Sequence, residues 1–126
     1  MRILDANAIL RYLLNDIEEQ ASEVADAVHE GAMTTPEVIA EVVYVLSGVY
    51  NMPRSDVSWY IHCTLLDIQV ENVKTLRYAM SVFNLTTLDF VDCLMVAYHK
   101  VLGMDIMTFD KKLNYTLAKE PEIFEE

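Results

Sequence analysis

The chain has 126 residues, 53% of them hydrophobic and 23% charged, which is an ordinary globular composition and excludes an intrinsically disordered protein. Nine Lys and Arg against 20 Asp and Glu give a formal net charge of −11, so nucleic-acid binding through a broad positive surface is disfavoured. No uncharged run approaches the roughly 20 apolar residues that a membrane span needs, so we expect one domain over residues 1–126, outside any membrane.

The first third of the chain alternates short apolar runs with helical patterns. Residues 1–4 predict a buried strand, and Asp5 is placed to cap a helix that ends before Asn15. A second, amphipathic helix is expected over residues 17–30. Gly31 then stands where a left-handed residue ends a helix, and a second short strand follows it over residues 32–34.

The middle of the chain contains the most apolar predicted helix. It begins with Thr35 and Pro36, a hydroxyl cap followed by proline at the first position, and continues to about residue 49. Because this helix is apolar almost all round, we expect it to lie deep in the core. A fourth helix is expected from Pro53 towards Leu66, followed by a weaker strand over residues 68–70.

The last third predicts two long helices and a final strand. Asn72 is placed to cap a fifth helix, and a sixth begins at Thr86, Thr87 or Asp89 and stops at Gly103. Residues 105–108 predict a last clear strand, and a helical turn and an edge strand are expected from residue 111 onward. Strands that alternate with helices in this way predict a parallel sheet covered by helices.

The sulfur and imidazole side chains carry no sign of a site. Cys63 and Cys93 both lie in apolar helical patterns and are typical of reduced core thiols, and the three histidines lack zinc-ligand spacing. Arg2 is followed within three residues by Asp5, which leaves no room for the apolar stretch of a secretion signal. We therefore expect a cytoplasmic protein.

Four acids stand where simple solvation does not explain them. Asp5 and Asp110 each follow a predicted strand, at the end where parallel sheets hold ligands. Glu41 and Asp92 lie inside apolar stretches of helices, where an unpaired carboxylate would cost several kcal/mol or be protonated. Four carboxylates that meet at one sheet edge ionise together only around cations, and ligation by oxygen alone favours Mg²⁺ or Mn²⁺. Such a site commonly serves phosphodiester cleavage.

Each acid also has a simpler explanation. Asp5 and Asp89 are favoured N-cap residues, and Asp110 is a common turn residue. Glu37, one turn before Glu41, suits the first turn of a helix through its interaction with the helix dipole. A buried salt bridge could account for Glu41, with three possible partners in the first half of the chain: Arg2, Arg11 and Arg54.

Four blocks of the sequence resemble the PIN-domain family, especially VapC-like toxin ribonucleases. They are residues 4–16, residues 36–46, residues 89–97 and residues 107–113, and they occur in the order of the family. The resemblance implies a three-layer α/β/α sandwich with a central, mostly parallel sheet of four or five short strands. It also implies that residues 1–126 form a single nuclease domain.

The resemblance also implies roles for particular residues. Asp5, Glu41, Asp92 and Asp110 match the acidic catalytic and metal-binding positions of the family, for Mg²⁺ or Mn²⁺. Supporting positions are matched by Asn7, Thr108 and, less closely, Asp89. The implied protein is a metal-dependent endoribonuclease, a homodimer, inhibited by a cognate antitoxin. Because the surface is acidic, RNA phosphates must be met locally, and the candidates are Arg11, Lys100, Lys111 and Lys112.

Two other functions compete with this one. The first is a binding module that keeps the fold and pairs with an antitoxin or other protein without cutting RNA, which the acidic composition favours and the intact set of four acids disfavours. The second is a phosphorylated receiver domain, which also has an acidic pocket in a parallel α/β sheet. The acids of a receiver belong at strand ends, whereas Glu41 and Asp92 lie within predicted helices.

Overall fold

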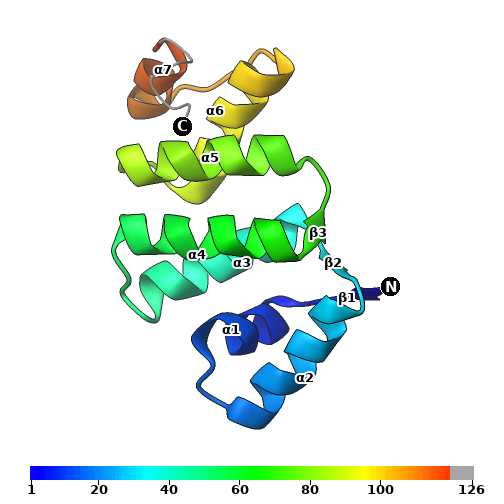
Figure 1. The fold of residues 1–126 in the computed structure, drawn as a ribbon. Coiled ribbons are helices and arrows are strands. Elements are labelled where there is room, and N and C mark those ends of the chain that lie inside the picture. The colour runs from blue at the N-terminus through cyan, green and yellow to red at the C-terminus, as the bar shows by residue number, and fades with distance from the viewer. Residues whose placement is uncertain (120–126) are drawn as a thin grey trace. The chain divides into compact units, whose positions relative to one another are not determined.

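A computed structural model of the protein describes residues 1–119. The chain divides into two compact units, Met1–Val73 and Lys74–Glu126, and each is described by itself (Figure 1). The strands found in the described residues all belong to the first unit. None of the helices in this part of the chain combines the length and apolar character needed to cross a bilayer.

The sheet of the first unit is parallel throughout, as expected. It consists of β1 (Arg2–Ile3), β2 (Ala32–Thr34) and β3 (Gln69–Val70), in the order β1-β2-β3. The buried Thr34 hydroxyl donates to the Leu4 carbonyl oxygen at 2.9 Å, and the Leu4 N–H donates to the Met33 carbonyl at 2.8 Å. These bonds continue the contact between β1 and β2 past the strand itself, towards Asp5.

The helices of the first unit begin and end where the local sequence predicts. They are α1 (Ala6–Leu14), α2 (Glu18–His29), α3 (Pro36–Gly48) and α4 (Arg54–Asp67). The Thr35 hydroxyl accepts from the Val38 N–H at 3.2 Å and so caps α3. Asn15 and Gly31 adopt left-handed backbone conformations, with φ of 50° and 98°, directly after α1 and one residue beyond the Glu30 cap of α2. The core between these elements includes fully buried aliphatic side chains of Ile9, Ile39, Val42, Leu46 and Ile61.

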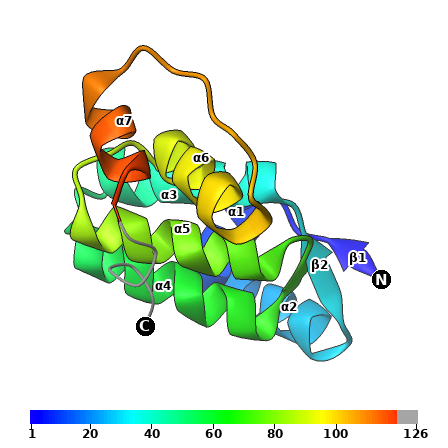
Figure 2. The same ribbon diagram turned by 90° about the horizontal axis from the view of Figure 1, so that it is seen from above.

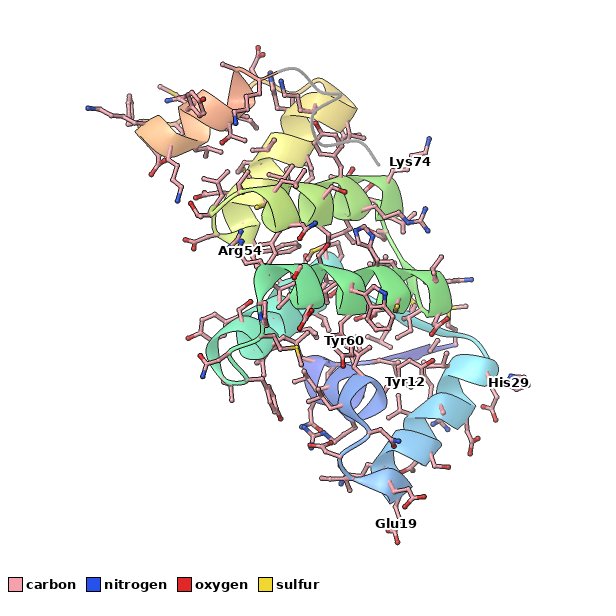
Figure 3. The ribbon with its side chains drawn as sticks, turned by 60° about the vertical axis from the view of Figure 1, so that its left-hand side comes forward. Tyr12, Glu19, His29, Arg54, Tyr60 and Lys74 are labelled. Carbon is pink, nitrogen blue, oxygen red and sulfur yellow. The ribbon has the colours of Figure 1, made fainter. Side chains whose placement is uncertain are left out.

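A tyrosine of α1 links that helix to the end of α4. The Tyr12 hydroxyl donates to Asp67 Oδ2 at 2.8 Å, and Figure 3 shows Tyr12 beneath α4. Burial raises the pKa of the Tyr12 hydroxyl above its ordinary value, and the hydrogen bond to Asp67 and the negative charge of that residue raise it further. The bond therefore holds two helices that are 55 residues apart in sequence.

The second unit is helical in its described part. Almost all of α5 (Val73–Leu85) belongs to it, together with α6 (Phe90–Leu102) and α7 (Lys111–Leu117). Phe83 and Phe90 pack edge to face across the turn from α5 to α6, with ring centroids 6.3 Å apart. Leu113 and Thr116 are the buried residues of α7, which contacts α6. Gly103 ends α6 in a left-handed conformation, as predicted.

The expected last strand is not formed, so the prediction of four or five strands is wrong for residues 1–119. Residues 105–108 lie in the long connection between α6 and α7, which has neither helix nor strand (Figure 2). The Thr108 hydroxyl accepts from the Asp110 N–H at 3.1 Å, a local bond of the kind that competes with strand pairing. Met107 and Phe109 are 88% and 90% exposed.

Two smaller expectations also change. Asn72 has a positive φ of 57°, which differs from the extended conformation typical of an N-cap. The expected edge strand beyond residue 111 is replaced by α7 up to residue 117, and residues 120–126 lie outside the described part of the chain. Cys63 and Cys93 are not joined in a disulfide; Cys93 is buried and Cys63 is half-buried.

Candidate functional site

Asp5 lies at the carboxyl end of β1 and at the start of α1. Its Oδ1 atom accepts the Ala8 N–H at 2.8 Å, so the residue is an N-cap, as the simpler explanation predicts. The side chain is nevertheless exposed. Because the cap uses Oδ1, the second oxygen, Oδ2, is the one that can face a ligand.

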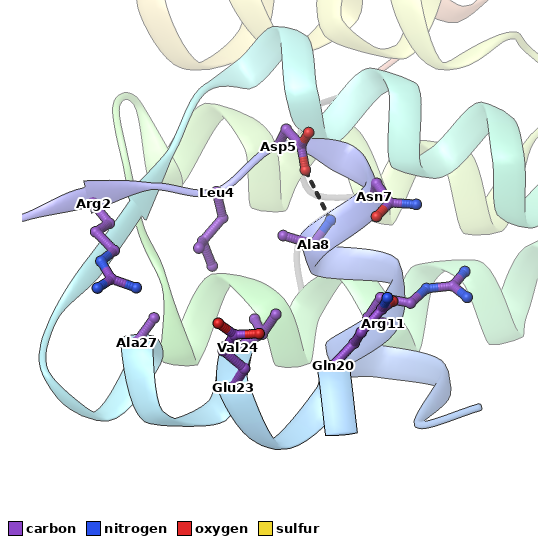
Figure 4. A pocket seen from close by; sticks show the side chains of 10 residues that line it. All are labelled: Arg2, Leu4, Asp5, Asn7, Ala8, Arg11, Gln20, Glu23, Val24 and Ala27. Carbon is purple, nitrogen blue, oxygen red and sulfur yellow. Dashed lines mark hydrogen bonds between the residues drawn. The ribbon is translucent and has the colours of Figure 1, made fainter. Parts of the chain in front are cut away.

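A cavity of about 320 Å³ lies beside Asp5, between β1, α1 and α2. This volume is at the lower end of the range of small-ligand pockets. Figure 4 shows Asp5 above the cavity, with Arg2 and Arg11 towards its opposite ends. Its polar lining comprises Arg2, Asp5, Asn7, Arg11, Gln20 and Glu23. The structure therefore brings the predicted supporting residue Asn7 to the same cavity as Asp5.

Arg11, one of the predicted phosphate contacts, is held by its neighbour. Its Nη1 atom forms a salt bridge with Asp16 Oδ2 at 2.9 Å, and its side chain is only 14% exposed. The buried Nε atom of the same guanidinium has no hydrogen-bond partner within the described residues. Arg11 thus lines the cavity as a cation whose charge is already paired with Asp16.

Glu41 lies on the surface of α3, which corrects the expectation that this helix is buried on all sides. Glu37, Glu41 and Tyr44 are all exposed and follow the i, i+4, i+7 spacing of one helix face. The opposite face contains the buried residues Ile39, Val42, Val43 and Leu46. A buried salt bridge is therefore not needed to explain Glu41.

Three acids of the second unit interact around the start of α6. Burial is the main reason that the pKa of Asp92 is raised above its ordinary value, and the negative charges of Asp89 and Asp110 raise it further. The positive charge of Lys112 acts in the opposite direction. Asp89 and Asp92 lie on the first turn of α6 and Asp110 caps α7, so two helix starts place negative charge near one another.

The local bonds of these acids differ. Asp89 stands at the N-cap position of α6, but its side chain makes no capping hydrogen bond, so its carboxylate remains available. Asp110 uses Oδ1 to accept the Leu113 N–H at 2.8 Å, as Asp5 does in α1. Thr108, the other predicted supporting residue, accepts the Asp110 N–H.

The remaining predicted cations differ in their surroundings. Lys100 donates from Nζ to the Lys119 carbonyl oxygen, and Lys112 donates from Nζ to the Thr87 carbonyl at 3.1 Å. Lys111 is exposed. Two of the three lysines are therefore used inside the second unit.

The side chains of the predicted site suit a hard divalent cation, because they offer carboxylate oxygens with amide and hydroxyl groups beside them. The repulsion that Asp89 and Asp110 exert on Asp92 is what such an ion would relieve. Within residues 1–119, no three His, Cys, Asp or Glu side chains form a ready-made metal group.

Sequence reasoning missed Glu23 and the bond from Lys112 to Thr87. Glu23 could have been found, because Gln20, Glu23, Val24 and Ala27 follow the spacing of one face of α2 and all line the cavity. The Lys112 bond spans 25 residues and has no sequence signal.

The comparisons with known proteins give one family. A family model described as PIN domain matches residues 2–117, which is most of the chain. Neither the curated proteins nor the solved structures contain a match.

Proposed function

Because this chain belongs to the PIN domain family, we propose that it is a metal-dependent endoribonuclease and the toxin of a toxin–antitoxin pair. PIN domains are generally nucleases that use divalent metal ions. One family match spans residues 2–117, which supports treating residues 1–126 as a single nuclease domain. The observation that carries the proposal is this match together with the three interacting carboxylates around the start of α6.

We assign metal binding and catalysis to Asp5, Glu41, Asp92 and Asp110, with Asp89 as an accessory acid. When bound, Mg²⁺ or Mn²⁺ would make water a better nucleophile at neutral pH and neutralise charge on the phosphate. The protein's own contribution is to hold these oxygens in place. The caps of α1 and α7 fix one oxygen each of Asp5 and Asp110, and the Thr108 hydroxyl fixes the backbone at Asp110.

RNA binding must overcome a net charge of −11. We propose that Arg11 and Lys111 contact phosphates near the acids, because Arg11 lines the cavity beside Asp5 and Lys111 is exposed next to Asp110. Two such contacts give weak affinity with a shallow salt dependence, because the slope scales with the number of phosphates neutralised. We therefore expect cleavage at low substrate concentration to decrease by less than about tenfold between about 50 and 200 mM salt.

Cleavage of RNA in Mn²⁺ by matched variants tests this function. Asp92→Asn and Glu41→Gln should each reduce kcat/KM at least about a hundredfold, because loss of a ligand exceeds the 10- to 100-fold effect of losing a ligand's partner. Glu37→Gln is the control, since Glu37 lies exposed on the same face of α3 one turn earlier. Equal cleavage by all these variants and the wild type would show that the activity belongs to a contaminant or to other residues.

The acidic composition supports one alternative, a PIN-like module that pairs with a protein and does not cut RNA. The same assay separates the two functions, because the module would release no products with either metal ion. Co-expression with the protein encoded by the adjacent reading frame tests the antitoxin. We expect it to form a complex with the chain and suppress cleavage in the cytoplasm.

We also propose a homodimer. Its support is an exposed apolar face on α4, where Trp59 and Leu66 are 64% and 75% exposed and lie seven residues apart, on one side of the helix. Light scattering should give a mass of about twice 14.4 kDa for the wild type. Leu66→Glu should shift the mass towards the monomer, whereas Ser22→Glu on an exposed position of α2 should not.

A further inference from the structure

The turn that carries Asp110 is fixed by its own hydrogen bonds. Thr108 Oγ1 accepts the Asp110 N–H at 3.1 Å, Asp110 Oδ1 accepts the Leu113 N–H at 2.8 Å, and the Thr108 carbonyl accepts from Asn114 Nδ2 at 2.9 Å. These bonds begin and end within residues 108–114. They set the conformation of the turn but do not place it against α6, where Asp92 lies.

Lys112 joins this turn to the loop before α6. Its Nζ atom donates to the Thr87 carbonyl oxygen at 3.1 Å. That loop is itself anchored, because the Thr86 hydroxyl donates to the Val82 carbonyl at 2.8 Å and accepts the Leu88 N–H at 3.3 Å. Thr87 precedes Asp89 by two residues, so the bond links the segment bearing Asp110 to the segment bearing Asp89.

We propose that Lys112 is a positioning residue, whose tether to the Thr87 carbonyl holds Asp110 beside Asp89 and Asp92. As a statement about a metal site, this rests on the proposed nuclease function. It assigns Lys112 a role inside the protein in place of a contact with RNA phosphate. The electrostatics agree with this placement, since the charge of Lys112 acts on Asp92 against the charges of the two neighbouring acids.

The adjacent Lys111 provides a matched control. It has the same charge and is exposed, and the described residues show no hydrogen bond from its side chain. Consecutive residues of a helix point about 100° apart, so Lys111 cannot share the direction of Lys112. Lys111→Met therefore controls for the loss of one exposed cation from α7, whereas both the tether and the charge that acts on Asp92 belong to Lys112.

The first experiment measures Mn²⁺ affinity of the full chain by calorimetry. Lys112→Met should weaken binding about tenfold, as the loss of a group that orients a ligand does, and Lys112→Arg should restore most of it. Lys111→Met should stay close to wild type. Removing a nearby cation without any change in geometry would tighten Mn²⁺ binding, so tighter or unchanged affinity in Lys112→Met overturns the proposal.

The second experiment measures amide hydrogen exchange in the metal-free chain. Lys112→Met should speed exchange across residues 108–114 at least about threefold, because the turn loses its link to the loop before α6. Exchange in Lys111→Met should match wild type. If the wild type binds no Mn²⁺, the proposed function fails while this measurement still tests the tether, and unchanged exchange in Lys112→Met would refute the tether itself.

RNA binding gives the third readout. If Lys112 contacts a phosphate, Lys112→Met should make the plot of log RNA-binding constant against log salt concentration less steep. Its slope should fall by about one, as loss of a phosphate contact produces. A tether leaves the slope unchanged. A reduced slope combined with wild-type exchange would return Lys112 to the RNA-binding surface.

Discussion

Asp5 and Asp110 do the same local task in two different settings. Each caps a helix, with Oδ1 accepting the N–H three residues later at 2.8 Å. Asp5 follows a strand that is paired with β2. Asp110 follows residues 105–108, which form no strand, and its backbone is held by the Thr108 hydroxyl.

The difference separates what is encoded locally from what is not. A cap needs only a short polar side chain and the first turn of a helix, so the sequence specifies it at both places. A strand needs a partner elsewhere in the chain, and an apolar run says nothing about that partner. Side-chain bonds from Thr108, Lys112 and Asn114 hold Asp110 in place, whereas strand pairing in the sheet holds Asp5 in place.

The largest expected effect tests whether the two caps share a chemical role. Asp5→Asn and Asp110→Asn keep the cap, because Asn caps helices about as well as Asp, so the free energy of unfolding should change by less than about 0.5 kcal/mol. Each loses a charged ligand, so kcat/KM for RNA should drop at least about a hundredfold. Cleavage assays and urea unfolding measure the two quantities. Full activity in either variant would remove that acid from the site.

The second effect compares the bonds behind the two acids. Thr34→Val removes a fully buried hydrogen bond to the Leu4 carbonyl and should reduce the free energy of unfolding by about 1–3 kcal/mol. Thr108→Val removes a bond that water can replace and should cost about 0.5–1 kcal/mol. Urea denaturation measures both. Equal losses would mean that the two acids are held equally firmly.

The third effect removes the caps themselves. Asp5→Ala should reduce the free energy of unfolding by about 1 kcal/mol, and Thr35→Ala, which uncaps α3, gives the reference value. Asp110→Ala uncaps a helix of seven residues, so we expect its main effect to be faster amide exchange at Leu113. A global loss as large as that of Asp5→Ala would show that α7 is more central to stability than its length suggests.

The smallest effect is electrostatic and belongs to the region of Asp110. The pKa of Asp92 is raised, so the folded protein binds this proton more readily than the unfolded chain does. The resulting stability is present at low pH and is lost as pH rises through the folded pKa. Compared with Asp92→Asn, metal-free wild type should therefore lose relative stability as pH rises above about 4, the ordinary range of the carboxyl pKa.

Thermal unfolding over that pH range measures the difference. Asp26→Asn, at an exposed position of α2, is the control, and its unfolding temperature should change with pH in the same way as that of the wild type. If the wild type instead became more stable relative to Asp92→Asn as pH rises, its neighbours would be stabilising Asp92 as a carboxylate.

Most of the fold could be predicted because its boundaries are set by local chemistry. Asp5, Thr35, Gly31 and Gly103 act at helix ends as their residue types predict. The last strand could not be predicted correctly, since the four-residue run at 105–108 satisfies the same apolar pattern as β2. Its polar end at Thr108 makes a turn instead.

The residue types of the site could be predicted from the sequence. The burial and neighbours of these residues could be predicted less well. The pattern around Glu41 suggested burial because apolar residues flank it in sequence. The helix separates them, with Glu41 on the exposed face and Val42 and Val43 on the buried one. The cavity beside Asp5 needs α2 to pack against α1, and the Lys112 tether spans 25 residues, so neither has a local signature.

Because Trp59 is exposed, its fluorescence can report whether this side of α4 is covered. It is the sole tryptophan of the chain and packs edge to face on Tyr60, with ring centroids 5.4 Å apart. Its fluorescence should already be red-shifted in the folded monomer, and so a poor monitor of denaturation. A blue shift on raising the protein concentration, or on adding an inhibitory partner, would instead report that this side of α4 has become covered.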